Sequence, residues 1–177
     1  MLGRFVRRPR LALTGLALCG GLSGAVLVAT GSAAYANQAP ATYLAAESSG
    51  LNLDVSQYGG VIQNQVTYST GQYWSVPEAG SYGRIKNFGY NACVTTDGVP
   101  GDQLYLKPCT RSLAACQTWY TQPAESLQNV TSYNFSNPYF GLVVDVYGNS
   151  GQPGALIDGW PYNGQFNQWF QLQFVNP

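Results

Sequence analysis

The sequence predicts a single all-β domain built from three related segments and preceded by an export signal. Three observations carry this prediction. Apolar stretches of three to six residues, such as 103–106 and 142–146, alternate with Gly, Asn, Pro and Ser, a pattern typical of short strands joined by turns. Helical periodicity is hard to find after residue 37. One phrase, a strand followed by a loop and then Gln-x-aromatic, also occurs three times along the chain.

Residues 1–36 have the organisation of a signal peptide. Four arginines precede an apolar run over residues 11–29, and Ala34-Tyr35-Ala36 forms a small-residue cleavage site. A membrane anchor is the alternative, but glycines interrupt the run and a cleavage site follows it. A twin-arginine signal at Arg7-Arg8 and lipid attachment at Cys19 fit the flanking residues poorly. We therefore expect a secreted, extracellular chain of residues 37–177 with no membrane insertion.

Charge and composition exclude several classes of function. Four of the eight basic residues lie in the signal, whereas all eight acidic residues follow it, so residues 37–177 carry a formal charge of −4. Such a chain has no basic surface for nucleic acid or anionic lipid. The sequence contains no histidine, which excludes a serine–histidine–acid triad, a cysteine–histidine pair and histidine-ligated zinc. We expect no cofactor.

The repeated phrase ends in Gln72-Tyr73-Trp74, Gln117-Thr118-Trp119 and Gln168-Trp169-Phe170. The glutamines are 45 and 51 residues apart, about the length of a four-strand unit. Such units are too small to form separate cores, so the aromatic residues should be buried together around a pseudo-threefold axis. We predict repeats over about residues 43–82, 83–128 and 129–177. The glutamines should satisfy backbone groups at a turn.

These motifs, together with the segments Leu53-Asp54-Val55 and Val144-Asp145-Val146, resemble the ricin-type β-trefoil lectins. The resemblance covers roughly residues 43–175. It implies a β-trefoil of three four-strand repeats, twelve strands in all, with a short barrel closed by hairpins. It also implies a carbohydrate-binding protein whose partners are galactose-type sugars, xylan or another polysaccharide. In this family an aspartate accepts sugar hydroxyls, an aromatic side chain stacks on the sugar and an amide completes the site.

The third repeat matches that pattern best. Asp145 is the acceptor, Trp160 the aromatic platform, and Asn167 and Gln168 the amides. Asp158 is a departure, because it stands where the family often has glutamine, and an ionised carboxylate accepts but cannot donate a hydrogen bond. Two acids in one pocket should raise one of their pKa values. Sugar binding is therefore expected to depend on a mildly acidic pH.

The other two repeats match less well. The first keeps Asp54, Gln63 and Gln72 as a weaker candidate site, but Asn64 replaces the aromatic residue and Gly71 the amide. Tyr58 or Tyr68 is a substitute platform. The second repeat has Thr95 for the aspartate and Lys107 for the aromatic residue, so we interpret it as structural.

Three cysteines follow the signal: Cys93, Cys109 and Cys116. In an oxidising compartment two of them should pair, but the spacing does not select the pair. The resemblance to the ricin-type family implies a disulfide between Cys93 and Cys109. Cys116 would then be buried and reduced. We expect no metal site.

Two other functions remain open. Asp145 and Asp158 could form the carboxylate pair of a glycoside hydrolase, although we expect shallow pockets and therefore no enzyme. A protein-binding trefoil, such as an inhibitor or a toxin-like module, is the stronger alternative, because the fold alone does not decide function. If one sugar site operates, it should bind weakly and need self-association, a separately encoded hydrolase or a polymeric ligand.

Overall fold

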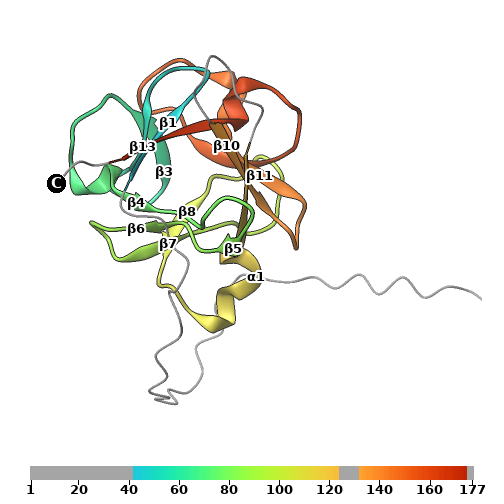
Figure 1. Cartoon of the computed structure of the whole chain (residues 1–177). Helices are drawn as coiled ribbons and strands as arrows, with labels where there is room; N and C mark the ends of the chain where they lie inside the picture. The colour runs from blue at the N-terminus through green and yellow to red at the C-terminus, as the bar shows by residue number, and fades with distance from the viewer. Residues whose placement is uncertain (1–41, 124–131, 175–177) are drawn as a thin grey trace, which may run out of the picture.

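The computed structural model describes residues 42–123 and 132–174, so the signal peptide predicted for residues 1–36 lies outside it. Within these ranges short antiparallel strands predominate and helical segments span only three or four residues (Figure 1). The predicted all-β class and β-trefoil architecture are confirmed. None of the helices in the described ranges has the length and apolar character needed to span a bilayer.

Seven strands form a ring of antiparallel pairings. These are β1 (Thr42–Ala46), β4 (Trp74–Ser75), β5 (Tyr82–Gly83), β6 (Lys86–Asn87), β9 (Trp119–Pro123), β10 (Ser132–Asn137) and β13 (Phe170–Phe174). The pairings run from β13 to β1, β4 and β6, and from β5 to β9, β10 and back to β13. Because β5 and β6 are consecutive parts of one segment, the ring closes through the chain itself.

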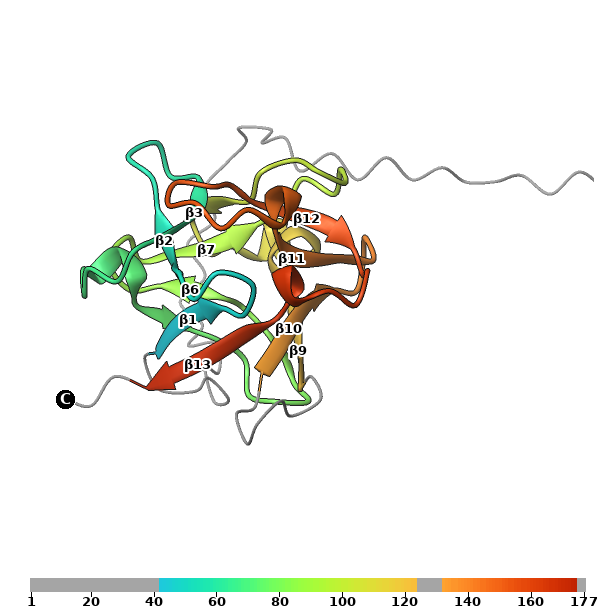
Figure 2. The same ribbon diagram turned by 90° about the horizontal axis from the view of Figure 1, so that it is seen from above.

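Three hairpins, one from each repeat, complete the fold. They are β2 (Asn52–Val55) with β3 (Val61–Asn64), β7 (Ala92–Thr95) with β8 (Tyr105–Lys107), and β11 (Leu142–Val146) with β12 (Ile157–Pro161). Figure 2 shows β3, β7 and β12 towards one side of the molecule and β1, β13, β9 and β10 towards the other. Single bridges join the hairpins in a triangle: Gly60 to Tyr105, Gln103 to Asp158, and Leu156 to Ile62.

The described residues contain thirteen strand segments, one more than the expected twelve strands, because one strand is interrupted. The difference lies at the start of the second repeat, where one strand is divided into β5 and β6. The two pieces pair with different neighbours, since β5 lies against β9 and β6 lies between β4 and β7. In the third repeat the equivalent strand, β10, also changes partner, from β9 and β13 to β11, without interruption.

The core consists of corresponding residues from the three repeats, as the pseudo-threefold prediction requires. The Gln-x-aromatic residues Trp74, Trp119 and Phe170 are each fully buried, which confirms that they belong to the core. Three further sets join them in one hydrophobic cluster. These sets are Leu44, Ile85 and Phe135; Leu53, Val94 and Val144; and Val61, Leu104 and Ile157.

The glutamine of each motif ends a single helical turn. These turns are η1 (Thr70–Gln72), α1 (Ala114–Gln117), which follows η2 (Arg111–Leu113), and η4 (Phe166–Gln168). Each glutamine is fully buried. Its Nε2 donates to a backbone carbonyl, that of Gln65, Pro108 or Pro161, and its Oε1 accepts from a backbone amide, that of Thr67, Thr110 or Asn163. The prediction that the glutamines satisfy backbone groups at a turn is therefore confirmed.

Cys93 and Cys109 form a disulfide with a Cα–Cα distance of 5.2 Å, the pairing that the resemblance implied. It joins strand β7 to the segment after β8, closing a loop whose restriction in the unfolded chain is worth about 3 kcal/mol. Cys116 is buried, as expected. The described residues include no free cysteine, however, so the expectation that Cys116 is reduced is wrong.

Replacing Trp119 by alanine should lower the free energy of unfolding by about 3–5 kcal/mol, because the substitution leaves a large cavity in the core. It also removes the hydrogen bond of 3.1 Å from the indole Nε1 to the carbonyl of Val94. Urea denaturation would measure the loss. Trp160→Ala is the matched control, since that indole is 43% exposed and should cost less than about 1 kcal/mol. Equal losses in the two variants would contradict this account of the core.

Candidate functional site

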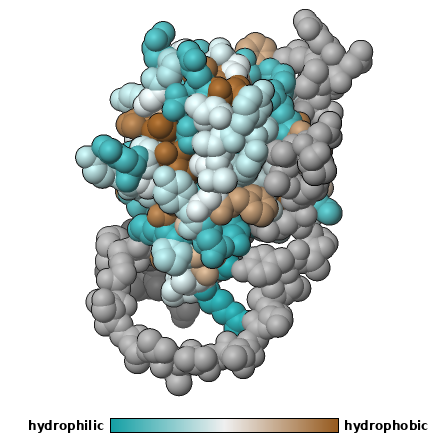
Figure 3. Space-filling view, turned by 90° about the vertical axis from the view of Figure 1, so that its left-hand side faces the viewer, coloured by the Kyte–Doolittle hydropathy of each residue, from teal (hydrophilic) through white to brown (hydrophobic). Residues whose placement is uncertain are grey.

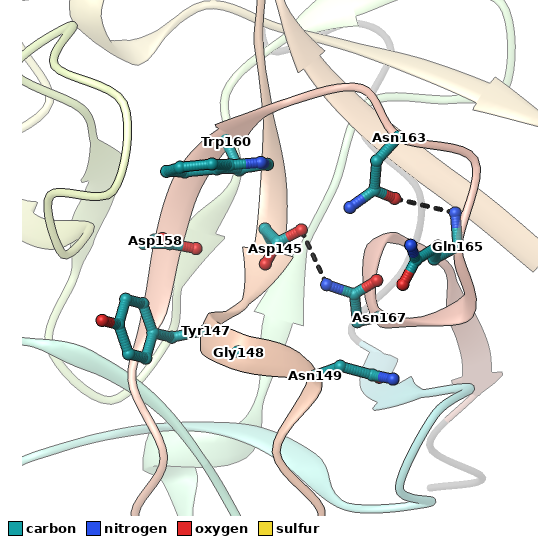
Figure 4. Close-up of a pocket in the computed structure, with 9 residues that line it drawn as sticks. All are labelled: Asp145, Tyr147, Gly148, Asn149, Asp158, Trp160, Asn163, Gln165 and Asn167. Atoms are coloured by element: carbon teal, nitrogen blue, oxygen red, sulfur yellow. Dashed lines mark hydrogen bonds between the residues drawn. The ribbon is translucent and has the colours of Figure 1, made fainter.

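A surface pocket of about 420 Å³ lies in the third repeat. Its walls come from β11, η3 (Tyr147–Asn149), β12 and the segment that leads into η4. The lining residues are Asp145, Tyr147, Gly148, Asn149, Asp158, Trp160, Asn163, Gln165 and Asn167 (Figure 4). Four of the five residues predicted for the third-repeat site therefore line one pocket, and the fifth, Gln168, lies behind it in contact with Asp145.

Asp145 is held in one orientation from within the protein. Its Oδ2 accepts hydrogen bonds of 2.8 Å from Asn167 Nδ2 and 2.8 Å from Gln168 Nε2. Gln168 is the motif glutamine, so the bond set that organises the fold also positions this carboxylate. Burial raises the pKa of Asp145, and the hydrogen bonds from Gln168 and Asn167 act in the opposite direction.

Asp158 stands directly opposite Asp145 in the antiparallel pair β11–β12. The side chain is only 2% exposed, and its Oδ1 has no hydrogen-bond partner among the described residues. Burial raises the pKa of Asp158 to about 7, and the charge of Asp145 and a hydrogen bond between the two carboxyl groups act in the same direction. Asp158 therefore keeps its proton to a higher pH than an ordinary aspartate.

Trp160 forms an exposed aromatic wall above the two carboxyl groups (Figure 4). It follows Asp158 by two positions, and alternate residues of a strand project from the same face. A loop of the second repeat supports it. Gly101 donates a hydrogen bond of 2.8 Å to the carbonyl of Gly159, and a Cβ at Gly101 would lie 3.2 Å from the indole ring. The neighbouring repeat therefore contributes to the position of the platform.

Sequence reasoning missed four of the polar or aromatic lining residues: Tyr147, Asn149, Asn163 and Gln165. Tyr147 gives the pocket a second aromatic wall, across Asp158 from Trp160 (Figure 4). The alternation of side chains along a strand could have identified Tyr147, because it follows Asp145 by two positions. The other three lie in turns, where no periodicity identifies the direction of a side chain. Among the described residues no group of three or more acidic or cysteine side chains could hold a metal ion.

The first repeat brings only part of its predicted site together. Asp54 and Gln72 are in contact, with Gln72 Nε2 donating to Asp54 Oδ2 over 3.1 Å. Asn64, which replaces the platform, donates to the same oxygen over 3.3 Å, and the amide of Val55 donates to Oδ1. The carboxylate thus has partners within its own repeat. Gly71 stands where the third repeat has the site amide, and a Cβ there would lie 2.8 Å from Asp54 Oδ1, so a larger residue would displace that carboxylate.

Gln63 does not join Asp54. It pairs with Leu53 in the register of β2 and β3, whereas Asp54 pairs with Ile62. Ile62 therefore corresponds to Asp158, and Gln63, which the sequence assigns to the weaker candidate site, lies one residue beyond that position. Gln63 is fully buried, and its Nε2 donates to the carbonyls of Ser150 and Gln152 in the third repeat. It links two repeats and faces away from the candidate site.

The second repeat keeps the framework of the site without its acid. Gln117 Nε2 donates to Thr95 Oγ1 over 3.0 Å, in the place of the aspartate contact. Tyr105 occupies the position that corresponds to Asp158, since it pairs with Thr95. Tyr58 is exposed, and Tyr68 has its ring 5.7 Å from that of Tyr43. Neither tyrosine lines the pocket of the third repeat.

The fold and site define a β-trefoil domain with a surface pocket that combines carboxyl, amide and aromatic groups. A family model described as ricin-type β-trefoil lectin domain-like matches residues 70–160. This chain belongs to that family. No curated protein sequence matches it.

Solved structures confirm the fold. A designed threefold-symmetric protein, ThreeFoil, is similar with a TM-score of 0.67 at 21% identity, over 76% of this chain and 99% of that one. A ricin B-like lectin from Macrolepiota procera, solved with lactose, has a TM-score of 0.62 at 15% identity, over 75% and 94%. An exo-β-1,3-galactanase from Clostridium thermocellum has a TM-score of 0.63 at 24% identity, over 79% of this chain but 30% of that one.

Replacing Asp158 by asparagine should stabilise the protein more at alkaline than at acidic pH. A carboxyl group whose pKa is raised by folding stabilises the native state below its ordinary pKa, and this contribution is lost as the pH rises through its folded value. For Asp158 the window runs from 3.8 to about 7. Thermal unfolding of both proteins across this window tests the effect. A difference in Tm that stays constant with pH would contradict it.

Proposed function

We propose that the protein is a secreted lectin that binds one saccharide unit of a glycan or polysaccharide in the third-repeat pocket. The observation that carries the proposal is the position of Trp160 over Asp145, which Asn167 and Gln168 hold in place. A sugar presents apolar C–H faces and hydroxyl groups. An aromatic surface stacks on the former, and fixed oxygen and nitrogen atoms bind the latter.

A comparison of the three repeats supports a single working sugar site. In the first repeat Asn64 replaces the platform and is bonded to Asp54. In the second, Thr95 and Lys107 replace the acid and the platform. A single shallow site with a dissociation constant near 1 mM gives only about −4 kcal/mol. A polymer with repeated epitopes, self-association or a separately encoded hydrolase would supply the missing avidity.

The position of the two carboxyl groups argues against hydrolysis in this pocket. A retaining glycosidase holds its carboxyl groups about 5–5.5 Å apart, and an inverting one holds them farther apart, on either side of the scissile bond. Asp145 and Asp158 are cross-strand neighbours that hydrogen-bond to each other. No sugar ring fits between them. We therefore propose a binding protein and no enzyme.

A protein-binding trefoil is the second candidate function. Docking surfaces for proteins usually include a continuous apolar patch. Figure 3 shows one face of the molecule, on which hydrophobic residues form several separate groups among hydrophilic ones. That face supports the sugar-binding proposal better than a protein interface. Competition separates the two functions, because a free monosaccharide should displace a glycan ligand and leave a protein partner bound elsewhere.

Trp160→Ala should abolish retention on the sugar matrix that holds the wild type. Loss of the stacking residue should cost about 2 kcal/mol of binding free energy, which weakens binding roughly thirtyfold. Immobilised galactose, mannose and xylan provide the first panel, because the family resemblance indicates galactose-type sugars and xylan-type chains. Asn64→Ala, at the corresponding position of the first repeat, is the matched control and should be retained like the wild type. Unchanged retention of Trp160→Ala on a matrix that holds the wild type would show that this pocket is not the sugar site.

A further inference from the structure

We propose that the third-repeat pocket prefers a saccharide with a free amino group, such as a 2-amino-2-deoxyhexose unit, over the neutral and N-acetylated forms of the same sugar. This inference rests on the proposed function and specifies the ligand class of that site. Three features of the pocket carry it: an excess of hydrogen-bond acceptors, uncompensated negative charge, and aromatic walls on both sides of the charge.

Two buried acceptor atoms of the pocket lack a donor, whereas the amide hydrogens of Asn167 already have acceptors. The two Nδ2 hydrogens of Asn167 point to Asp145 and to the carbonyl of Val146, at 2.8 and 3.3 Å. Its Oδ1 is buried without a partner, and so is Oδ1 of Asp158. Both side chains are less than 5% exposed and both line the pocket. An ammonium group brings three donors and no acceptor, which matches this set.

The charge of the pocket favours the same ligand. None of its nine lining residues is lysine or arginine, whereas two are aspartates. When Asp158 is ionised, the two carboxylates repel each other in a partly dehydrated site. A ligand ammonium between or beside them would act as the counter-charge that the protein itself does not place there. N-acetylation removes that charge and adds a carbonyl acceptor.

The two aromatic walls are compatible with a cation. Trp160 and Tyr147 line the pocket on opposite sides of Asp158 (Figure 4). The faces of aromatic rings attract ammonium groups, and tryptophan does so most strongly. The same faces stack on the C–H surface of a sugar ring. An amino sugar therefore uses each element of the site.

The preference should depend on pH through Asp158. The titratable groups on the segments around it are Asp145 on β11, Tyr147 on η3, and Asp97 and Asp102 on the loop that packs on β12. Of these, Asp145 is the group that shifts the pKa of Asp158, which is about 7. As the pH rises through this value Asp158 ionises, so the affinity for an ammonium sugar should rise. An amino group of ordinary pKa stays largely protonated at about pH 7.

Isothermal titration calorimetry at low salt tests the proposal. The probes are galactosamine, N-acetylgalactosamine and galactose, and the matching set glucosamine, N-acetylglucosamine and glucose, each at about pH 5 and about pH 7. The amino form should bind about tenfold more tightly than its neutral counterpart at the higher pH, the gain expected of a charge-assisted hydrogen bond, and less so at the lower pH. Added salt should reduce the difference.

Asp158→Asn should remove the preference for the amino sugar and its pH dependence, so that the variant binds the amino and neutral forms of a sugar with similar affinity at both pH values. Asp102→Asn is the matched control, because it removes the same charge from an exposed residue outside the pocket and should keep the preference. Equal affinity of the wild type for amino and neutral forms would overturn the inference and leave the lectin function intact. A wild type that binds none of the six sugars or the polymers would overturn the proposed function as well.

Discussion

The structure depends on one hydrogen-bonded group that occurs three times: the buried side-chain amide of the motif glutamine. In each repeat its nitrogen and oxygen join two backbone groups of the preceding turn, and the nitrogen also donates to residue 54, 95 or 145 on the first hairpin strand. A buried amide left unpaired would cost about 1–3 kcal/mol. The glutamine therefore ties the turn, the hairpin and the adjacent core aromatic together, and the candidate site is built on that tie.

The repeats can differ because the Nε2 group of the motif glutamine requires only a hydrogen-bond acceptor at the hairpin position. Thr95 meets the requirement with a hydroxyl group, so the second repeat keeps its fold without an acid. Asp54 meets it too, but Asn64 and the amide of Val55 also bond to its carboxylate. Asp145 accepts the same hydrogen bond from Gln168 and also lines a pocket together with Trp160 of the next strand. Folding thus constrains the glutamine strictly and leaves the binding residues free to change.

The features that could be predicted from the sequence are those that recur at a regular spacing along the chain. The spacing of Gln72, Gln117 and Gln168 identified the repeats and their buried aromatic residues, and the family pattern identified Asp145 and Trp160. The register of the hairpins could not be predicted, because their loops differ in length and a shift of one residue reverses the face of a strand. For this reason the sequence predicts Gln63 beside Asp54, whereas in the structure it is Ile62 that pairs with Asp54. Contacts between repeats, such as Gly101 behind Trp160, depend on the assembled fold and leave no local signal.

Asp158 is the residue that the fold least requires. The corresponding positions hold Ile62 and Tyr105, so neither the ring nor the hairpins need an acid there. Its burial beside Asp145 raises its pKa to about 7, which means that the native state is penalised for ionising it at neutral pH. Sites that bind ligands commonly retain groups that lower stability. When a positively charged ligand binds, its charge would offset the unfavourable ionisation of Asp158. The free energy that ionised Asp158 costs the free protein would then contribute to the affinity for the ligand.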